Sequence, residues 1–161
     1  MGEDALLPFV DAWSVDIDAP PRVVWEAVLA SAPGARAGVA RRGFAVLLGM
    51  DPATSNGLAS HVLGAELPGF TVCEVVPPMT YALAGRHRFA AYQLVFRIDQ
   101  RGPGQSRLTA ETFATFPGTA GRLYRMILMD AKLHALVMWS MVRRVRRRAE
   151  TTLGRQGAVS S

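Results

Sequence analysis

Cysteine is almost absent from the sequence. Cys73 is the single cysteine among 161 residues, so the chain cannot form an internal disulfide. No group of cysteines and histidines has the spacing of metal ligands, and no glycine-rich phosphate loop or GxSxG nucleophile motif occurs. The sequence therefore predicts a protein with no metal and no cofactor, and it gives no support to redox chemistry or phosphoryl transfer.

The sequence also lacks a long uninterrupted apolar run and a basic leader. No apolar stretch has the length that crosses a bilayer without a charged or helix-breaking residue. The first residues, MGEDALLPFV, are acidic and contain only a short apolar run, unlike a secretory signal. We therefore expect a soluble cytoplasmic protein.

Lysine is scarce too, and arginine carries the positive charge. The net charge is +5, Lys132 is the single lysine, and arginines gather in the segment RRVRRRAE. Such a run is typical of a solvated helix end, where arginines complement the helix dipole. The alternative is that these arginines bind phosphates of anionic lipid or nucleic acid. Aromatic residues do not interleave with the arginines, so nucleic acid is the least favoured partner.

The spacing of apolar residues predicts a single domain over residues 1–150 and a flexible tail over residues 151–161. Trp13, Val15 and Ile17 alternate with polar residues, which predicts a strand, and the segment APPRVVWEAVLAS predicts a short helix. Residues 35–50 fit a second short helix or a buried strand, and a helix is favoured. Further strands are predicted at residues 61–67, 70–76, 79–85, 91–99 and 107–116.

Residues 121–150 have the pattern of one long amphipathic helix. An antiparallel sheet must cover its apolar face, and this helix is the only predicted element long enough to do so. The order of strand, short helix, several strands and long helix therefore predicts an α+β fold.

This order resembles the START-like, or SRPBCC, superfamily, which has the helix-grip fold and includes the polyketide cyclase/dehydrase and lipid-transfer groups. The resemblance is carried by IDAP followed by VVWEAV, by PGF before a strand, and by SRLTAE followed by FPGTAGRLYR. It implies a curved antiparallel sheet wrapped around the C-terminal helix, often with a cavity for an apolar ligand. Members range from carriers to cyclases, so the resemblance does not choose between binding and catalysis.

Two titratable residues lie on the apolar side of the long helix. His134 falls within the apolar stripe, and Asp130 lies one turn earlier at the edge of that stripe. A carboxylate bonded to an imidazole can orient the ring and raise its basicity, as a general base requires. His134 and Asp130 are therefore the candidate catalytic pair. The alternative is that His134 is a core-edge histidine whose ring is satisfied by Asp130 or by a backbone carbonyl.

The predicted function is the binding of a hydrophobic small molecule, which is a lipid, a polyketide-like aromatic or an isoprenoid, between the sheet and the last helix. The predicted lining residues are Tyr81, Tyr92, Leu94, Phe96, Ile127, Ala131 and Met138. His87 and Arg88, between two predicted strands, are interpreted as a solvated turn, with contact to a ligand as the alternative.

Two other functions stay open. One is a cyclase or dehydratase that uses His134 with Asp130 and no cofactor. The other is an interaction module whose basic helix binds an anionic membrane or a partner. Leu136 and Trp139 lie away from the apolar stripe of that helix, which also suits a homodimer contact.

Overall fold

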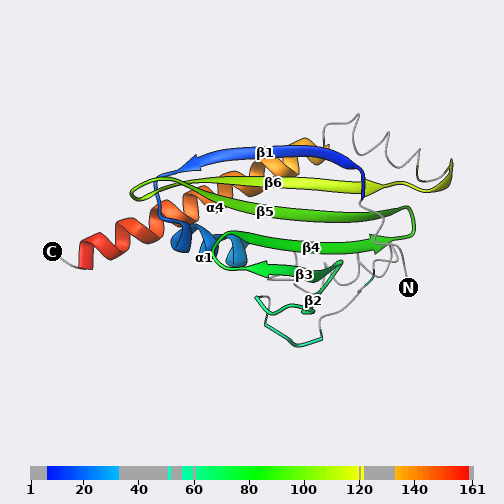
Figure 1. Cartoon of the computed structure of the whole chain (residues 1–161), viewed down its shortest axis with the longest axis horizontal. Coiled ribbons are helices and arrows are strands. Elements are labelled where there is room, and N and C mark those ends of the chain that lie inside the picture. The colour runs from blue at the N-terminus through cyan, green and yellow to red at the C-terminus, as the bar shows by residue number, and fades with distance from the viewer. Residues whose placement is uncertain are drawn as a thin grey trace.

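The computed structural model describes residues 7–32, 51, 56–59, 61–119, 121 and 133–159 (Figure 1). The predicted α+β fold is confirmed. The elements, in chain order, are β1 (Phe9–Ile17), α1 (Pro21–Ser31), β2 (Glu66–Leu67), β3 (Phe70–Val76), β4 (Thr80–His87), β5 (Ala90–Gly102), β6 (Gln105–Thr115) and α4 (Leu133–Val159).

The strands form one curved antiparallel sheet in the order β1-β6-β5-β4-β3-β2. Helix α4 contacts β1, β6 and α1, while α1 also contacts β5 and β6. Figure 1 shows α4 crossing the sheet diagonally, with its C-terminal part extending past the end of the sheet where β1 leads into α1. We call the face of the sheet that these helices cover the inner face.

The alternating sequence pattern explains which side chains the inner face buries. In β6, buried Ser106, Leu108, Ala110, Thr112 and Ala114 alternate with more exposed residues. In β5, Leu94, Phe96 and Ile98 are buried on the same period of two. The predicted one-sided burial of this sheet is therefore confirmed.

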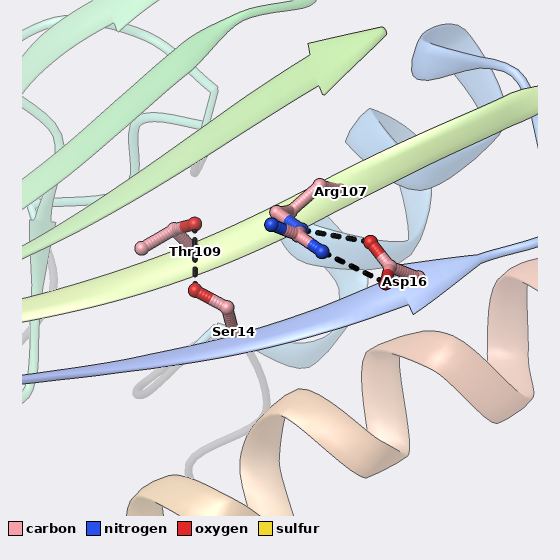
Figure 2. A network of polar contacts seen from close by, with 4 residues as sticks. All are labelled: Ser14, Asp16, Arg107 and Thr109. Carbon is pink, nitrogen blue, oxygen red and sulfur yellow. Dashed lines mark hydrogen bonds and ion pairs between the residues drawn. The ribbon is translucent and has the colours of Figure 1, made fainter. Parts of the chain in front are cut away.

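The outer face of β1 and β6 is polar, as Figure 2 shows. Arg107 donates two hydrogen bonds to the carboxylate of Asp16, of 2.8 and 2.9 Å, and the hydroxyls of Ser14 and Thr109 lie 3.0 Å apart. These residues are direct partners in the β1–β6 register. The hydrogen bond from Arg107 lowers the pKa of Asp16 below its ordinary value. The outer face is thus held by cross-strand polar pairs rather than by apolar burial.

The closed core lies beneath α1. Helix α1 begins at Pro21, a residue that is tolerated in the first turn because it needs no N–H partner there, and it buries Val24, Trp25, Ala27 and Val28. The ring of Tyr81 meets Trp25 edge-on at 6.1 Å and stacks on Phe96 at 6.3 Å, measured between ring centres. Tyr81 is fully buried, and this burial raises its pKa to about 12. Its phenol therefore stays neutral.

The predicted apolar stripe of α4 is confirmed over the described residues. Met138, Met141, Val142, Val145 and Ala149 are all buried. The helix continues to Val159, past the end at residue 150 that the sequence pattern indicates and into the segment predicted to be a tail. The stripe itself continues, because Leu153 packs against the core, four residues after Ala149.

Of two other predicted elements, one is shorter in the structure than predicted and one lies outside the described residues. The strand predicted over residues 61–67 is reduced to β2, because Gly64 adopts a positive φ of 81° and the chain turns there. Asn56 holds this turn: its side chain accepts from the backbone N–H of Glu66 and donates to the carbonyl of Gly64. The helix predicted within residues 35–50 lies outside the described residues.

Candidate functional site

A cavity of about 200 Å³ lies between the inner face of the sheet and the first described turns of α4. It is at the opposite end of the inner face from α1, because its strand residues come from the start of β5 and the end of β6. The lining is mostly apolar, with a few polar side chains. The lining residues are Phe70, His87, Ala90, Tyr92, Gln93, Leu94, Thr112, Ala114, Phe116, His134, Val137, Met138 and Met141.

One aromatic wall of the cavity is held by a close backbone approach. The Tyr92 hydroxyl donates to the carbonyl of Gly69 at 2.7 Å, and the rings of Tyr92 and Phe70 meet edge-on at 5.3 Å. Gly85 lies opposite Tyr92 on β4. A Cβ at that position would overlap the Gly69 carbonyl oxygen and lie 2.8 Å from the Tyr92 ring. Glycine at position 85 is therefore needed for this wall to form.

His87 belongs to the same wall. Its Nδ1 accepts the backbone N–H of Phe89 at 3.1 Å, and its ring centre lies 5.6 Å from that of Tyr92. Burial lowers the pKa of His87. The ring therefore favours the neutral state, with the proton on Nε2, because Nδ1 is the acceptor. Arg88, its neighbour, is exposed and does not line the cavity.

His134 lines the cavity, but the structure gives its ring a partner other than the predicted one. Its Nε2 lies 3.3 Å from Oδ1 of Asp11, on β1, and Oδ2 of Asp11 accepts the indole N–H of Trp13 at 3.0 Å. The side chains of His134 and Asp11 are 16% and 27% exposed. Asp130 lies outside the described residues. The carboxylate that orients this imidazole thus comes from a strand and not from the preceding helical turn.

Asp11 faces inward because of its register in the sheet. It pairs with Thr112 of β6, as Trp13 pairs with Ala110 and Ile17 with Ser106. A β-bulge between Phe9 and Asp11 shifts the strand by one residue at this point. Bulges re-aim side chains, and this one ends the regular pairing just beyond the carboxylate. A carboxyl group therefore lies on a mostly apolar face.

Thr112 also lines the cavity, but its hydroxyl oxygen is fully buried. The residue is 7% exposed, and its Oγ1 has no hydrogen-bond partner among the described residues. It is the direct cross-strand neighbour of Asp11 on one side and of Leu94 on the other. Cross-strand Cβ atoms lie about 4.5–5.5 Å apart, so Thr112 lies beside Asp11, the partner of His134.

The predicted lining residues fall into three groups. Tyr92, Leu94 and Met138 line the cavity together with His134. Tyr81 and Phe96 lie in the closed core and are not among the lining residues, because Trp25 of α1 packs on this part of the sheet. Ile127 and Ala131 lie outside the described residues.

Asp11 and Thr112 are not among the predicted site residues, although the sequence contains a signal for one of them. The alternation of Trp13, Val15 and Ile17 extends back to Asp11 and places it on the same face of the strand. The sequence contains no such signal for Thr112. Its hydroxyl is unusual only because it has no hydrogen-bond partner among the described residues, and a sequence pattern does not record this.

The outward side of α4 exposes apolar and basic side chains. Leu136 and Trp139 are 59% and 44% exposed, and Cζ of Arg143 lies 4.5 Å from the centre of the Trp139 ring. Val137, between them in sequence, lines the cavity and is 54% exposed. Four arginines border a shallow depression further along the helix: Arg144, Arg147, Arg148 and Arg155. The contact with a second copy or with an anionic membrane stays a prediction for this surface.

Within the described residues, no group of three or more histidine, cysteine or acidic side chains is arranged to hold a metal ion. None of the helices in that part of the chain has the length and apolar character needed to cross a membrane.

No protein-family model matches the chain, and no curated protein matches its sequence. Solved structures do resemble it. Truncated norcoclaurine synthase from Thalictrum flavum has a TM-score of 0.52 at 9% identity, over 91% of this chain and 96% of that one. The protein TTHA0849 from Thermus thermophilus has a TM-score of 0.52 at 12% identity, over 90% of this chain and 99% of that one.

A point mutant of the Thalictrum synthase, solved with a transition state analogue, also has a TM-score of 0.52, at 12% identity, over 89% of this chain and 96% of that one. At such identities the likeness shows the fold alone. The fold is the helix-grip fold, with a curved antiparallel sheet around a C-terminal helix.

Proposed function

We propose that this helix-grip protein binds a small apolar molecule in the cavity between the sheet and α4. The observation that carries the proposal is the cavity itself, where apolar and aromatic side chains surround a few polar groups. This composition is typical of small-molecule sites. Met138 and Met141 line the helix side, and flexible thioethers adapt to ligands of differing shape.

The cavity volume narrows the class of ligand. An apolar cavity of about 150 Å³ binds benzene, while drug-sized ligands occupy sites of roughly 300–1,000 Å³. At about 200 Å³, this cavity fits a one-ring compound or a short aliphatic chain better than a whole lipid or a fused-ring polyketide. Of the predicted ligand classes, the smallest aromatic and isoprenoid members are therefore favoured.

The test is calorimetric titration with toluene, after organic extraction and mass spectrometry have identified any ligand that co-purifies. The wild type should bind toluene saturably. Ala114→Leu places a larger side chain in the cavity wall and should abolish binding while the protein stays folded. Ala12→Leu makes the same change on the exposed side of β1 and should bind as the wild type does. A wild type that is empty on extraction and binds no toluene would contradict the proposal.

The Asp11–His134 pair favours a second candidate function, catalysis by proton transfer. In the tautomer that donates from Nε2 to Asp11, the imidazole of His134 would present Nδ1 as a base. Next to a bound ketone, it would remove an α-proton to leave an enolate, as a cyclase or dehydratase requires. The geometry also fits a purely binding role, so this function ranks second.

Solvent exchange tests the catalytic candidate directly. In deuterium oxide, the wild type should speed the replacement of the methyl protons of acetophenone by deuterium, followed by proton NMR. His134→Gln should bring the rate down to that of buffer while toluene binding persists. An unaccelerated exchange rate with the wild type would remove this candidate and leave the binding function intact.

A further inference from the structure

We propose that the outward face of α4 binds the surface of an anionic lipid bilayer. Seven exposed residues of this helix define what we call the α4 surface: Leu136, Trp139, Arg143, Arg144, Arg147, Arg148 and Arg155. The proposal goes beyond the binding of a small molecule and holds whether or not the cavity contains a ligand.

The helical repeat brings apolar and basic side chains onto one side of α4. Residues seven or eleven positions apart are nearly in line, because an α-helix has about 3.6 residues per turn. Leu136 is therefore in line with Arg143 and Arg147. Arg144 and Arg148 follow on the neighbouring row, and all four arginines are exposed. The α4 surface thus has an apolar end in the first described turns and a basic end further along the helix.

The basic end has little acidic charge near it. Glu150 is the only acidic residue of α4, and its carboxylate accepts from Arg146 at 2.8 Å. Where α1 borders Arg148, the charges of Arg22 and Glu26 offset one another. The depression bordered by four arginines has no acidic side chain in its described lining. A cluster of roughly four to eight basic residues on an amphipathic helix is typical of sites that bind anionic lipid.

The apolar end suits the interfacial layer of a bilayer. Leu136 and Trp139 are about half-exposed, and the guanidinium of Arg143 lies over the Trp139 ring. An indole favours this layer because it combines an apolar body with a polar N–H group. Helices that lie on a membrane bury their apolar side chains about 5–10 Å deep while their basic side chains stay at the headgroups. The division of the α4 surface into two ends matches this arrangement.

The cavity borders the apolar end of the α4 surface. Val137 follows Leu136 directly, lines the cavity and is 54% exposed. A bilayer bound to the α4 surface would therefore lie next to one wall of the cavity.

Two other partners fit the α4 surface less well. A second copy of the chain would bring the arginines of both copies into one interface, where buried charges need acidic partners that α4 does not supply. Single-stranded nucleic acid binds by stacking its bases on several aromatic side chains. Trp139 is the only aromatic residue of α4, and Arg143 covers one side of its ring.

The first test is sedimentation with vesicles of phosphatidylcholine that contain about 30% phosphatidylserine. The wild type should sediment with these vesicles, should not do so with pure phosphatidylcholine, and should be released as NaCl rises from about 0.1 to about 0.5 M. The double variant Arg144→Gln and Arg147→Gln should bind about ten- to thirtyfold more weakly. The matched control is Arg86→Gln with Arg97→Gln, which removes the same charge from β4 and β5 and should bind as the wild type does.

The second test asks whether the apolar end enters the bilayer. Trp139 is 44% exposed, whereas Trp25 is buried and Trp13 is partly buried against the core. Phosphatidylserine vesicles with brominated acyl chains should therefore quench the fluorescence of the wild type and leave that of Trp139→Phe unchanged. Melting temperatures close to that of the wild type would show that the variants are folded, since every substituted side chain is exposed.

Four results would overturn the proposal. The first is a wild type that does not sediment with the anionic vesicles, and the second is an equal loss of binding in the two double variants. The third is binding to single-stranded DNA as tight as to the vesicles, without quenching of Trp139. The fourth is a dimer in analytical ultracentrifugation that Leu136→Ser dissociates, which would assign the α4 surface to a second copy.

Discussion

The two ends of the inner face of the sheet differ in whether their buried hydroxyl groups have hydrogen-bond partners. Near α1, the Ser106 hydroxyl is fully buried and paired with the Ala19 carbonyl, beside the buried side chain of Ile17, its partner in the register. At the other end of the same strand, the Thr112 hydroxyl is buried without a partner in the described part of the chain, in a residue that lines the cavity. One strand thus serves both a closed core and an open site.

The two ends of the inner face are suited to different roles, one to stability and the other to binding. The closed end has the features of a well-packed core, with apolar side chains in contact and its buried hydroxyl satisfied. The open end has an apolar space lined in part by His134, with the Asp11 carboxyl group and the Thr112 hydroxyl, which is unpaired among the described residues, beside it. Natural sequences retain such unfavourable arrangements mainly at functional sites.

The largest expected effect is at the closed end. Phe96→Ala removes a ring that is 1% exposed and stacked on Tyr81, so it should lower the free energy of unfolding by about 3–5 kcal/mol. Phe70→Ala, in the cavity wall, should cost less, about 1–2 kcal/mol, because the ring is only partly buried. Urea denaturation of both variants checks this. Equal losses would mean that the two ends are packed alike.

The two hydroxyls of β6 should respond with opposite signs. Ser106→Ala leaves the Ala19 carbonyl buried without its donor and should cost about 1–3 kcal/mol. Thr112→Val loses no hydrogen bond and should be neutral or stabilising by up to about 1 kcal/mol. Denaturation midpoints of the two variants give the comparison directly. A destabilised Thr112→Val would show that its hydroxyl has a structural partner.

Gly85→Ala should damage the cavity wall. Its Cβ would overlap the Gly69 carbonyl oxygen, so Tyr92 or the strand must move, at a cost of about 1–3 kcal/mol. The affinity for toluene should fall as well. Gly102→Ala is the control, because a Cβ there meets only the Gln105 side-chain oxygen, at an ordinary 3.7 Å. If Gly85→Ala binds toluene as the wild type does, the wall is not held by this contact.

His87 should make the stability of the cavity end depend on pH. Burial lowers its pKa, so the folded state binds fewer protons than the unfolded state, whose value is near 6.5. The contribution of His87 is therefore fully present above pH 6.5 and is lost as the pH falls below it. The urea midpoint should drop less between pH 7.5 and 5.5 in His87→Gln than in the wild type. Identical drops would contradict the burial effect.

The smallest effect is expected on the outer face, at the exposed Asp16–Arg107 pair in Figure 2. Such pairs contribute little, because solvent screens both charges. Asp16→Asn should leave the denaturation midpoint at pH 7 almost unchanged. The lowered pKa of Asp16 adds stability only above about pH 3.8, and this is lost under more acidic conditions. A large loss at pH 7 would show that the outer face contributes more than this account assigns to it.

The sequence pattern predicted the elements better than the site. Two sequence patterns predicted which side chains are buried: the alternation around Trp13 and the helical stripe through Met138 and Val145. The structure confirms both. Tyr81 and Phe96 have the same alternation as Leu94, and only the position of α1 decides that they belong to the core and not to the cavity. Periodicity identifies the buried face but not the place where a helix stops covering it.

The polar end of the cavity was still harder to predict. His134 was predicted, but its partner, Asp11, lies 123 residues away and meets it only through the packing of α4 on β1. A contact within one helix can be predicted from spacing, whereas this one depends on the tertiary fold. No local pattern records that the Thr112 hydroxyl has no hydrogen-bond partner among the described residues.

Methyl NMR of the methionines during a toluene titration shows whether an apolar ligand enters the cavity between the sheet and α4. Met138 and Met141 line the cavity, whereas Met79 is 55% exposed and is not among the lining residues. If the ligand binds there, the Met138 and Met141 methyl signals should shift saturably and the Met79 signal should not shift. Signals that stay in place up to the solubility of toluene, or that move together with Met79, would contradict binding in the cavity.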